Sequence, residues 1–153
     1  MKKQRKVPAL LILLGIVLLG FGVYNCIWYN VVQHKYDPYT VDMRELYPGT
    51  HVLDGDNGYN YNVKFPDYLS YTGNLGVQTY NGVFALIIWP GIGKETTYGV
   101  RLPAEEGTEV WGIMLDYQHR ALTSDPAELA LVDQYQAQID DLFKMASTQW
   151  DIL

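Results

Sequence analysis

Two carboxylates lie close together in residues 54–58, where the sequence is Asp-Gly-Asp-Asn-Gly. Carboxylates two residues apart can converge on a hard cation, so a calcium-binding module is one hypothesis for this segment. The EF-hand pattern is not met, because Gly58 and Tyr59 stand at its fifth and sixth positions and Phe65 stands at its twelfth, where a carboxylate is needed. Asp and Asn beside Gly are typical of turns between strands, so we expect a turn here and no metal ligands.

Histidine and serine are the next candidates for chemistry. His34, His51 and His119 are far apart in the sequence, and none has a second ligand at helical or hairpin spacing. Neither Ser70 nor Ser124 lies in a GxSxG nucleophile motif. A hydrolase of envelope material that uses His51 or His119 with nearby carboxylates is an alternative hypothesis, if the fold brings such groups into one cleft. We assign no catalytic residue and no cofactor, and we favour a protein that is not an enzyme.

Two further motifs are incomplete. Residues 91–96, Gly-Ile-Gly-Lys-Glu-Thr, are similar to part of a phosphate-binding loop but lack the GxxxxGK[ST] spacing, so we expect a hairpin loop there. Cys26 is the single cysteine of the chain. It excludes an internal disulfide and any zinc or iron–sulfur site built from cysteines of this chain alone.

Tyrosine is the residue type that stands out, with 13 copies in 153 residues. Its ring supplies contact area and its hydroxyl a hydrogen bond, which suits the binding of sugars or peptides. Five tyrosines of the β-rich region are the candidate binding residues: Tyr59, Tyr61, Tyr68, Tyr71 and Tyr80. The alternative is that they reflect only the general preference of tyrosine for strands and partly exposed sheet faces.

Charge is distributed unevenly along the chain. The N-terminus carries Lys2, Lys3, Arg5 and Lys6, whereas all 17 acidic residues lie at or beyond Asp37. Without the N-terminal cluster, seven basic residues face 17 acidic ones, a net charge of −10. Binding to nucleic acid needs clustered Lys and Arg, so we expect no nucleic-acid partner.

Residues 7–32 of the N-terminal region contain no formally charged residue. A helix that is apolar on all sides is buried either in a protein core or in a membrane. A helix of this length measures roughly 39 Å and can cross a hydrocarbon layer of about 30 Å. The sequence predicts a cytoplasmic basic segment at 1–6 and a transmembrane helix at 7–32, with Tyr24, Trp28 and Tyr29 at the opposite membrane interface. We therefore expect a single-pass protein of the cell membrane with its C-terminal domain outside and the lipid bilayer as a partner.

Two other interpretations fit this region less well. A cleaved signal peptide would use Ala9–Leu19 as its apolar stretch and Gly20 and Gly22 as small residues before the cut, but the apolar run continues beyond them. A lipoprotein signal needs small residues directly before its cysteine, and Tyr24 and Asn25 precede Cys26. A retained anchor is the favoured interpretation.

For the rest of the chain we expect a short tether at 33–40 and one domain at 41–153. Alternation of apolar and polar residues predicts a strand at 59–65, and 75–80 and 83–89 flank Asn81-Gly82, the signature of a hairpin with a two-residue type I′ turn. The run 83–89 is apolar on both faces, so we expect a central strand covered on each side. Two more strands are expected at 96–102 and 109–117.

An amphipathic helix is expected near the C-terminus. Asp125 is a suitable N-cap, Pro126 fits the first helical position and Glu128 completes a capping box. The apolar stripe along it comprises Leu129, Val132, Tyr135, Ile139, Leu142, Phe143, Ala146 and Trp150. The predicted class is α+β: a transmembrane helix, then a small mixed or antiparallel sheet packed by this C-terminal helix.

The layout resembles that of small single-pass bacterial envelope proteins. The resemblance rests on the basic start, the single span, the lead-in at 41–44 (Val-Asp-Met-Arg) and the turn and strand start at 48–52 (Pro-Gly-Thr-His-Val). It assigns no functional residues. With no catalytic set and many tyrosines, we expect a membrane-anchored extracytoplasmic domain that binds a membrane or envelope protein or a glycan.

Overall fold

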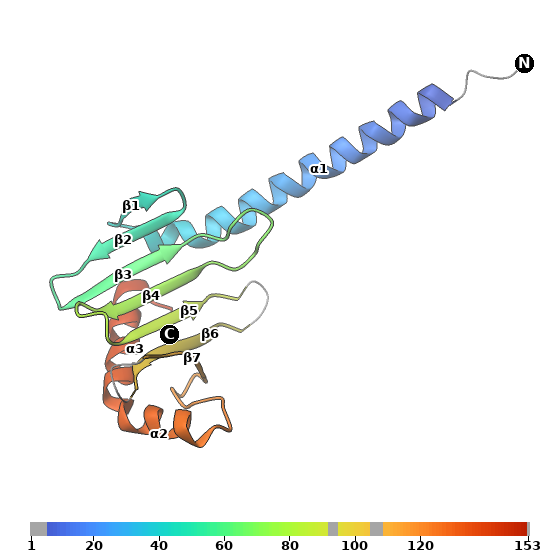
Figure 1. Cartoon of the computed structure of the whole chain (residues 1–153). Coiled ribbons are helices and arrows are strands. Elements are labelled where there is room, and N and C mark those ends of the chain that lie inside the picture. Colours follow the sequence, from blue (N-terminus) through green and yellow to red (C-terminus); the bar gives the residue numbers. More distant parts are fainter. Residues whose placement is uncertain (1–5, 92–94, 105–108, 153) are drawn as a thin grey trace, which may run out of the picture. The chain divides into compact units, whose positions relative to one another are not determined.

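The computed structural model describes residues 6–91, 95–104 and 109–152 (Figure 1). The chain forms two compact units, Met1–Lys35 and Tyr36–Leu153. The elements, in chain order, are α1 (Lys6–Tyr36), the 3-10 helix η1 (Asp37–Thr40), β1 (Arg44–Tyr47), β2 (Thr50–Asp54), β3 (Tyr59–Lys64), β4 (Asn74–Thr79), β5 (Ala85–Trp89), β6 (Thr97–Pro103), β7 (Glu109–Leu115), α2 (Pro126–Gln134) and α3 (Gln136–Trp150).

The first unit is one long apolar helix. Its most apolar window has a mean hydropathy of 2.4 and buries none of its residues in the protein, unlike the core helix of a soluble domain. By length and composition it can cross a membrane, and a signal sequence has the same properties. The side-chain amides of Asn25 and Asn30 donate to the carbonyls of Phe21 and Cys26, both at 2.7 Å, so the helix pairs these polar groups internally. Of the expected cytoplasmic segment, residues 1–5 lie outside the described residues.

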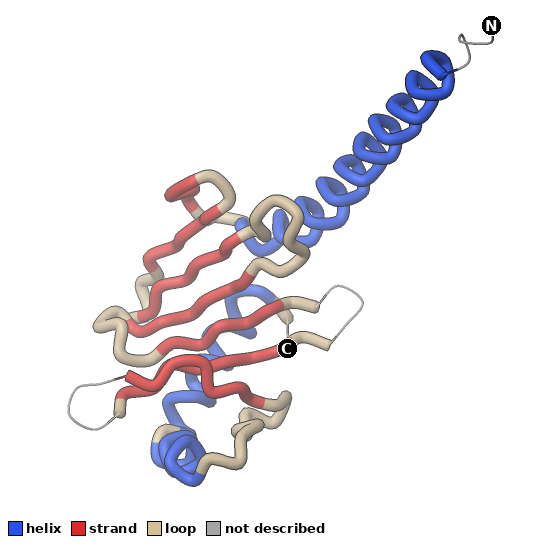
Figure 2. Tube along the Cα trace, turned by 45° about the vertical axis from the view of Figure 1, so that its right-hand side comes forward, coloured by secondary structure: helices blue, strands red, loops and turns tan. Residues whose placement is uncertain are grey.

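The second unit contains a seven-stranded sheet in which every strand pairs with its neighbours in sequence, in the order β1 to β7. All six pairings are antiparallel, so the sheet is antiparallel rather than mixed. The helices α2 and α3 follow the last strand (Figure 2). The α+β class expected from the sequence is confirmed.

The hairpin between β4 and β5 is confirmed, but its turn differs from the expected one. Its register, Leu75↔Ile88 to Gln78↔Ala85, is the one that a central Asn81-Gly82 would set. Only Gly82 has a positive φ, of 70°, whereas a type I′ turn needs two such residues. The Asn81 side chain instead accepts the Val83 N–H at 3.1 Å. The Thr79 N–H bonds to the Phe84 carbonyl at 3.0 Å, and the Gly82 N–H closes the turn on the Thr79 carbonyl at 2.8 Å.

The core fills the space between one face of the sheet and α3. Two rows of paired residues cross the strands on this face: Leu53, Tyr61, Val77, Leu86, Val100 and Ile113, and His51, Val63, Leu75, Ile88, Tyr98 and Leu115. From α3 the buried residues are Ile139, Leu142, Phe143, Ala146 and Trp150. The stripe expected in α3 is therefore the one that packs against β4 and β5.

The single C-terminal helix expected from the periodicity is two helices. Asp125 caps α2 as expected, accepting the Ala127 N–H at 2.8 Å. The helix ends at Gln134, and α3 begins after Tyr135, whose ring packs edge-on against Phe84 with 5.3 Å between centroids. No Gly or Pro marks this break, so the sequence pattern did not predict it.

The sequence predicted that the folded domain begins at Val41, but the second unit begins at Tyr36. Tyr36 is fully buried, its hydroxyl accepts the Gly73 N–H at 2.9 Å, and its ring lies 5.6 Å from that of Phe65. The Tyr39 carbonyl accepts the indole N–H of Trp150 at 3.0 Å. Residues 36–40 are thus part of the folded unit, because two aromatic side chains attach them to it.

Candidate functional site

The face of the sheet opposite α3 is not covered by any described element, which corrects the expectation that β5 is covered on both sides. One row of paired residues on this open face runs Asp54, Asn60, Gln78, Ala85, Arg101 and Trp111. The next row runs Val52, Asn62, Gly76, Ile87, Gly99 and Met114. Ile87 and Trp89 of β5 are only half-buried there. An antiparallel sheet commonly packs one face on the core and leaves the other face to solvent. The polar amides on β3 and β4 suit the solvent-exposed face.

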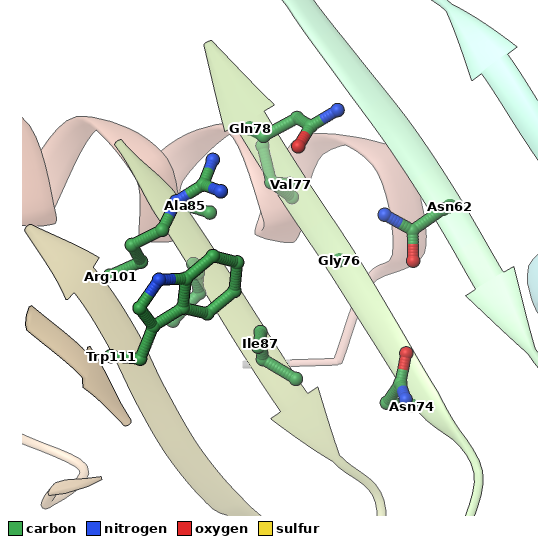
Figure 3. Close-up of a pocket in the computed structure, with 10 residues that line it drawn as sticks. Asn62, Asn74, Gly76, Val77, Gln78, Ala85, Ile87, Arg101 and Trp111 are labelled. Carbon is green, nitrogen blue, oxygen red and sulfur yellow. The ribbon is translucent and has the colours of Figure 1, made fainter. Parts of the chain in front are cut away.

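A hollow of about 140 Å³ lies on this open face, across β3 to β7. Figure 3 shows Asn62, Asn74, Gln78, Arg101 and Trp111 around it, with α3 behind the strands. Within the part of the chain that the structure describes, the side-chain amides of Asn62, Asn74 and Gln78 make no hydrogen bond. The Oδ1 atom of Asn60, in the same row as Gln78, is buried and also unpaired there. The face therefore offers several unused donors and acceptors.

Two glycines keep the open face flat. A Cβ on Gly76 would lie 2.5 Å from Nδ2 of Asn62, so the Asn62 amide lies directly over the β4 backbone. A Cβ on Gly99 would lie 2.9 Å from Cζ3 of Trp89, so the indole lies across the β6 backbone. Any larger residue at Gly76 or Gly99 would displace these planar groups.

Trp111 and Arg101 form the aromatic end of the hollow. The guanidinium of Arg101 lies over the Trp111 ring, 4.4 Å from its centroid, and 3.7 Å from the carboxylate of Glu109. It also donates to the carbonyl of Gly82 in the β4–β5 loop. Gly112, with φ at 79°, coincides with a register shift against β6 and allows Trp111 to pair with Arg101. The Trp111 side chain is nevertheless 60% exposed, so solvent reaches the ring from the side that Arg101 leaves free.

The five predicted binding tyrosines do not lie together on this face. Tyr61 is in the core, only 4% exposed, with its ring edge-on to Trp150. Tyr59 is on the same side and donates its hydroxyl proton to Asp141 of α3. This bond and burial raise the pKa of Tyr59 to about 12. Both rings thus have structural contacts with α3.

The other three tyrosines are exposed at the ends of strands. Tyr80 follows β4 and donates to the carbonyl of Gly55. Tyr68 and Tyr71 lie in the loop between β3 and β4. Tyr24, Trp28 and Tyr29, which were expected at a membrane interface, lie in the C-terminal half of α1.

Sequence reasoning missed the amides because polar residues that alternate with apolar ones were assigned only to a solvated face. The residues themselves, Asn60, Asn62, Asn74 and Gln78, are visible in the sequence. Knowing which strands are neighbours was needed to bring them together.

His51 and His119 lie at different places in the second unit, whereas His34 lies near the end of α1. Nδ1 of His119 is 2.7 Å from Oδ1 of Asp140, and its ring stacks on Phe143 at 3.8 Å. The hydrogen bond with His119 holds the pKa of Asp140 below its usual range. His51 instead lies against Phe65, with 5.3 Å between ring centroids. His119 therefore contacts a carboxylate, and His51 and His119 do not belong to one cluster.

In the acidic segment 54–58, Asp54 ends β2 and residues 55–58 form the turn to β3. The Asn57 side chain accepts the Tyr59 N–H at 3.2 Å, and Gly58 has φ at 89°. In the described ranges, no group of three His, Cys, Asp or Glu side chains could hold a metal ion. Of the expected loop at 91–96, residues 92–94 lie outside the described part.

Comparisons with protein-family models, curated proteins and solved structures give no match for this chain.

Proposed function

We propose that this chain is a membrane-anchored extracytoplasmic binding protein, without enzymatic activity, and that the open face of its sheet is the binding surface. The observation that carries the proposal is the group of unpaired amides beside an exposed indole, on a face that no described element covers. Surfaces that bind ligands combine aromatic area with a few converging polar groups. The partner is a component of the cell envelope.

The anchor in this proposal is α1. Its most apolar window is fully exposed, and its Asn side-chain amides pair with its own backbone. Basic residues before it favour a cytoplasmic N-terminus, and the acidic domain is then outside. Protease added to intact cells should digest the domain. A domain that is cut only after the cells are broken, or a mature chain that lacks α1, would contradict this topology.

The binding function is tested with the full chain in lipid nanodiscs, sedimented with isolated envelope material. Trp111→Ala removes the exposed indole of the open face, and Tyr68→Ala removes a comparably exposed ring from the β3–β4 loop. We expect wild type and Tyr68→Ala to sediment with the envelope and Trp111→Ala to lose at least tenfold in binding. If the folded wild type does not sediment with the envelope, the proposed binding function is contradicted. If both variants lose the same amount of binding, the assignment of the open face as the binding surface is contradicted.

A hydrolase is the second candidate, and it has one specific observation in its favour. Asp140 accepts or shares a hydrogen bond at His119 Nδ1, an arrangement that orients an imidazole for proton transfer. We compare hydrolysis of envelope material by the wild type and by His119→Gln. Turnover that the variant abolishes would replace the binding proposal; equal or absent turnover in both proteins would remove this candidate.

A further inference from the structure

We infer that the open face binds an uncharged glycan, whose sugar ring stacks on Trp111 while its hydroxyl groups bond to the amides of Asn62, Asn74 and Gln78. This inference rests on the proposed function and names the chemistry of its ligand. Four features of the face carry it: its hydrogen-bonding groups, its aromatic ring, its charge balance and its shape.

The hydrogen-bonding groups match those of a sugar. A hydroxyl group both donates and accepts, and each Asn or Gln amide presents one acceptor and two donors side by side. The side chains of Asn62, Asn74 and Gln78 make no hydrogen bond within the described chain, so their amides are free to bond to a ligand. A purely apolar ligand would leave these groups unpaired, which costs free energy.

The aromatic ring is held ready for stacking. Arg101 lies over the Trp111 ring at 4.4 Å and restricts its movement, while the ring remains largely exposed. The apolar C–H face of a sugar ring can pack on an indole, whose faces are flat and electron-rich. A ring that is positioned in advance loses little entropy on binding.

The charge balance argues against an anionic ligand. Arg101 is the one charged residue that lines the hollow, and Glu109 compensates it. Two exposed ion pairs lie at the side of the sheet away from Trp111, Arg44 with Asp54 and Lys64 with Asp67. The chain beyond the N-terminal basic cluster carries −10 net charge and therefore repels polyanions. A neutral polymer is not subject to this electrostatic repulsion.

The shape favours a polymer that lies on the surface. The hollow of about 140 Å³ is smaller than the pockets of about 300–1,000 Å³ that enclose small ligands. Its lining extends from β3 to β7, and four strand spacings measure about 19 Å. Gly76 and Gly99 keep this stretch low, so several consecutive sugars can contact it.

The test titrates the full chain in nanodiscs with three soluble tetrasaccharides. Two are neutral, the β-1,4-linked tetramers of glucose and of N-acetylglucosamine, and one is charged, the tetramer of galacturonic acid. Tryptophan fluorescence and calorimetry report binding, and circular dichroism confirms that each variant is folded. The variants are Trp111→Ala, Trp111→Tyr and Asn62→Ala, with Tyr68→Ala as the matched control outside the face.

We expect at least one neutral tetramer to saturate the protein and the charged tetramer to bind at least tenfold more weakly. Trp111→Ala should weaken binding at least tenfold and Asn62→Ala about threefold to tenfold, whereas Trp111→Tyr and Tyr68→Ala should stay within about threefold of wild type. Equal binding of the charged tetramer, or a Trp111→Ala variant that binds like wild type, would overturn the inference.

The failure of this inference differs from the failure of the proposed function. If no neutral oligosaccharide binds at about 10 mM while the envelope still sediments the chain through Trp111, the ligand is not a neutral glycan and a protein partner replaces it. If the wild-type chain does not sediment with the envelope at all, the proposed function itself fails.

Discussion

The guanidinium of Arg101 lies 4.4 Å from the centre of the Trp111 ring, and the two residues are direct partners on β6 and β7. Arg101 thereby connects three parts of the open face: the indole, the Glu109 carboxylate and the carbonyl of Gly82. Its side chain is only 12% exposed, so these contacts are largely shielded from solvent. The pair should contribute both to stability and to the shape of the candidate site.

Replacing Arg101 should therefore cost more than replacing a surface arginine. Arg101→Met keeps an unbranched apolar stem but removes the guanidinium with its charge and its hydrogen bond, and we expect a loss of about 1–3 kcal/mol in the free energy of unfolding. Arg44→Met is the control, because Arg44 and Asp54 form an exposed pair at 3.4 Å that contributes about 0–1 kcal/mol. Urea unfolding of both variants measures the difference. Equal losses would show that the Arg101 contacts add nothing beyond an ordinary surface pair.

The glycines of β4 and of the preceding loop should respond differently to alanine. At Gly73 a Cβ would lie 2.2 Å from the backbone oxygen of Lys64, which cannot move without the strand, so we expect Gly73→Ala to lower stability by at least about 2 kcal/mol. At Gly76 the obstacle is the Asn62 amide, which can rotate away, so we expect a loss below about 1 kcal/mol.

Although Gly76→Ala should cost little stability, it should weaken ligand binding. Gly76→Ala moves the Asn62 amide off the face and should weaken a glycan that bonds to it. A double variant, Gly76→Ala with Asn62→Ala, should be no weaker in binding than Asn62→Ala alone. Thermal unfolding and the tetrasaccharide titration check the two parts. A Gly76→Ala protein with wild-type binding would show that the position of Asn62 does not matter.

The sequence predicted those elements whose signal is local. The alternation in 59–65 corresponds to β3, the Asn81-Gly82 register to the β4–β5 hairpin and the Asp125 cap to the start of α2. It did not predict β1, Arg44–Tyr47, which is a short edge strand with all four residues exposed and so lacks an apolar period. The sequence also predicted α2 and α3 as one helix, because no Gly or Pro separates them. The break lies at Tyr135, whose ring packs against Phe84.

The candidate site was less accessible to sequence reasoning than the fold. Single rings were identified as candidates, but whether a ring lies in the core, as Tyr61 does, or on the open face, as Trp111 does, depends on strand register. The amides gain significance only when Asn62 and Gly76 are known to be direct partners across two strands. These relationships are long-range, and no periodicity within a single strand contains them.

The Tyr36 hydroxyl should stabilise the start of the folded unit. Tyr36→Phe leaves the buried N–H of Gly73 without its acceptor, so we expect a loss of about 1–2 kcal/mol in the free energy of unfolding. Tyr39→Phe is the control, since it keeps the backbone carbonyl that accepts from Trp150 and should change stability by less than about 0.5 kcal/mol. Denaturant unfolding compares the two. A stable Tyr36→Phe protein would mean that Gly73 finds another acceptor.

The Tyr59 hydroxyl should make stability depend on alkaline pH. Its bond to Asp141 raises the pKa of Tyr59 in the folded state to about 12, above the value of about 10 for an unfolded chain. The folded state then keeps a proton that the unfolded state has lost, so this contribution is complete below pH 10 and disappears as the pH rises towards 12. Tyr59→Phe removes the contribution, and we expect the stability difference between wild type and variant to shrink across that range. Absorbance at alkaline pH should show that the extra phenol of the wild type, compared with the variant, ionises only as the pH approaches 12; a wild type that already exceeds the variant by one ionised tyrosine near pH 10 would show that the Asp141 bond does not hold the phenol in its neutral form.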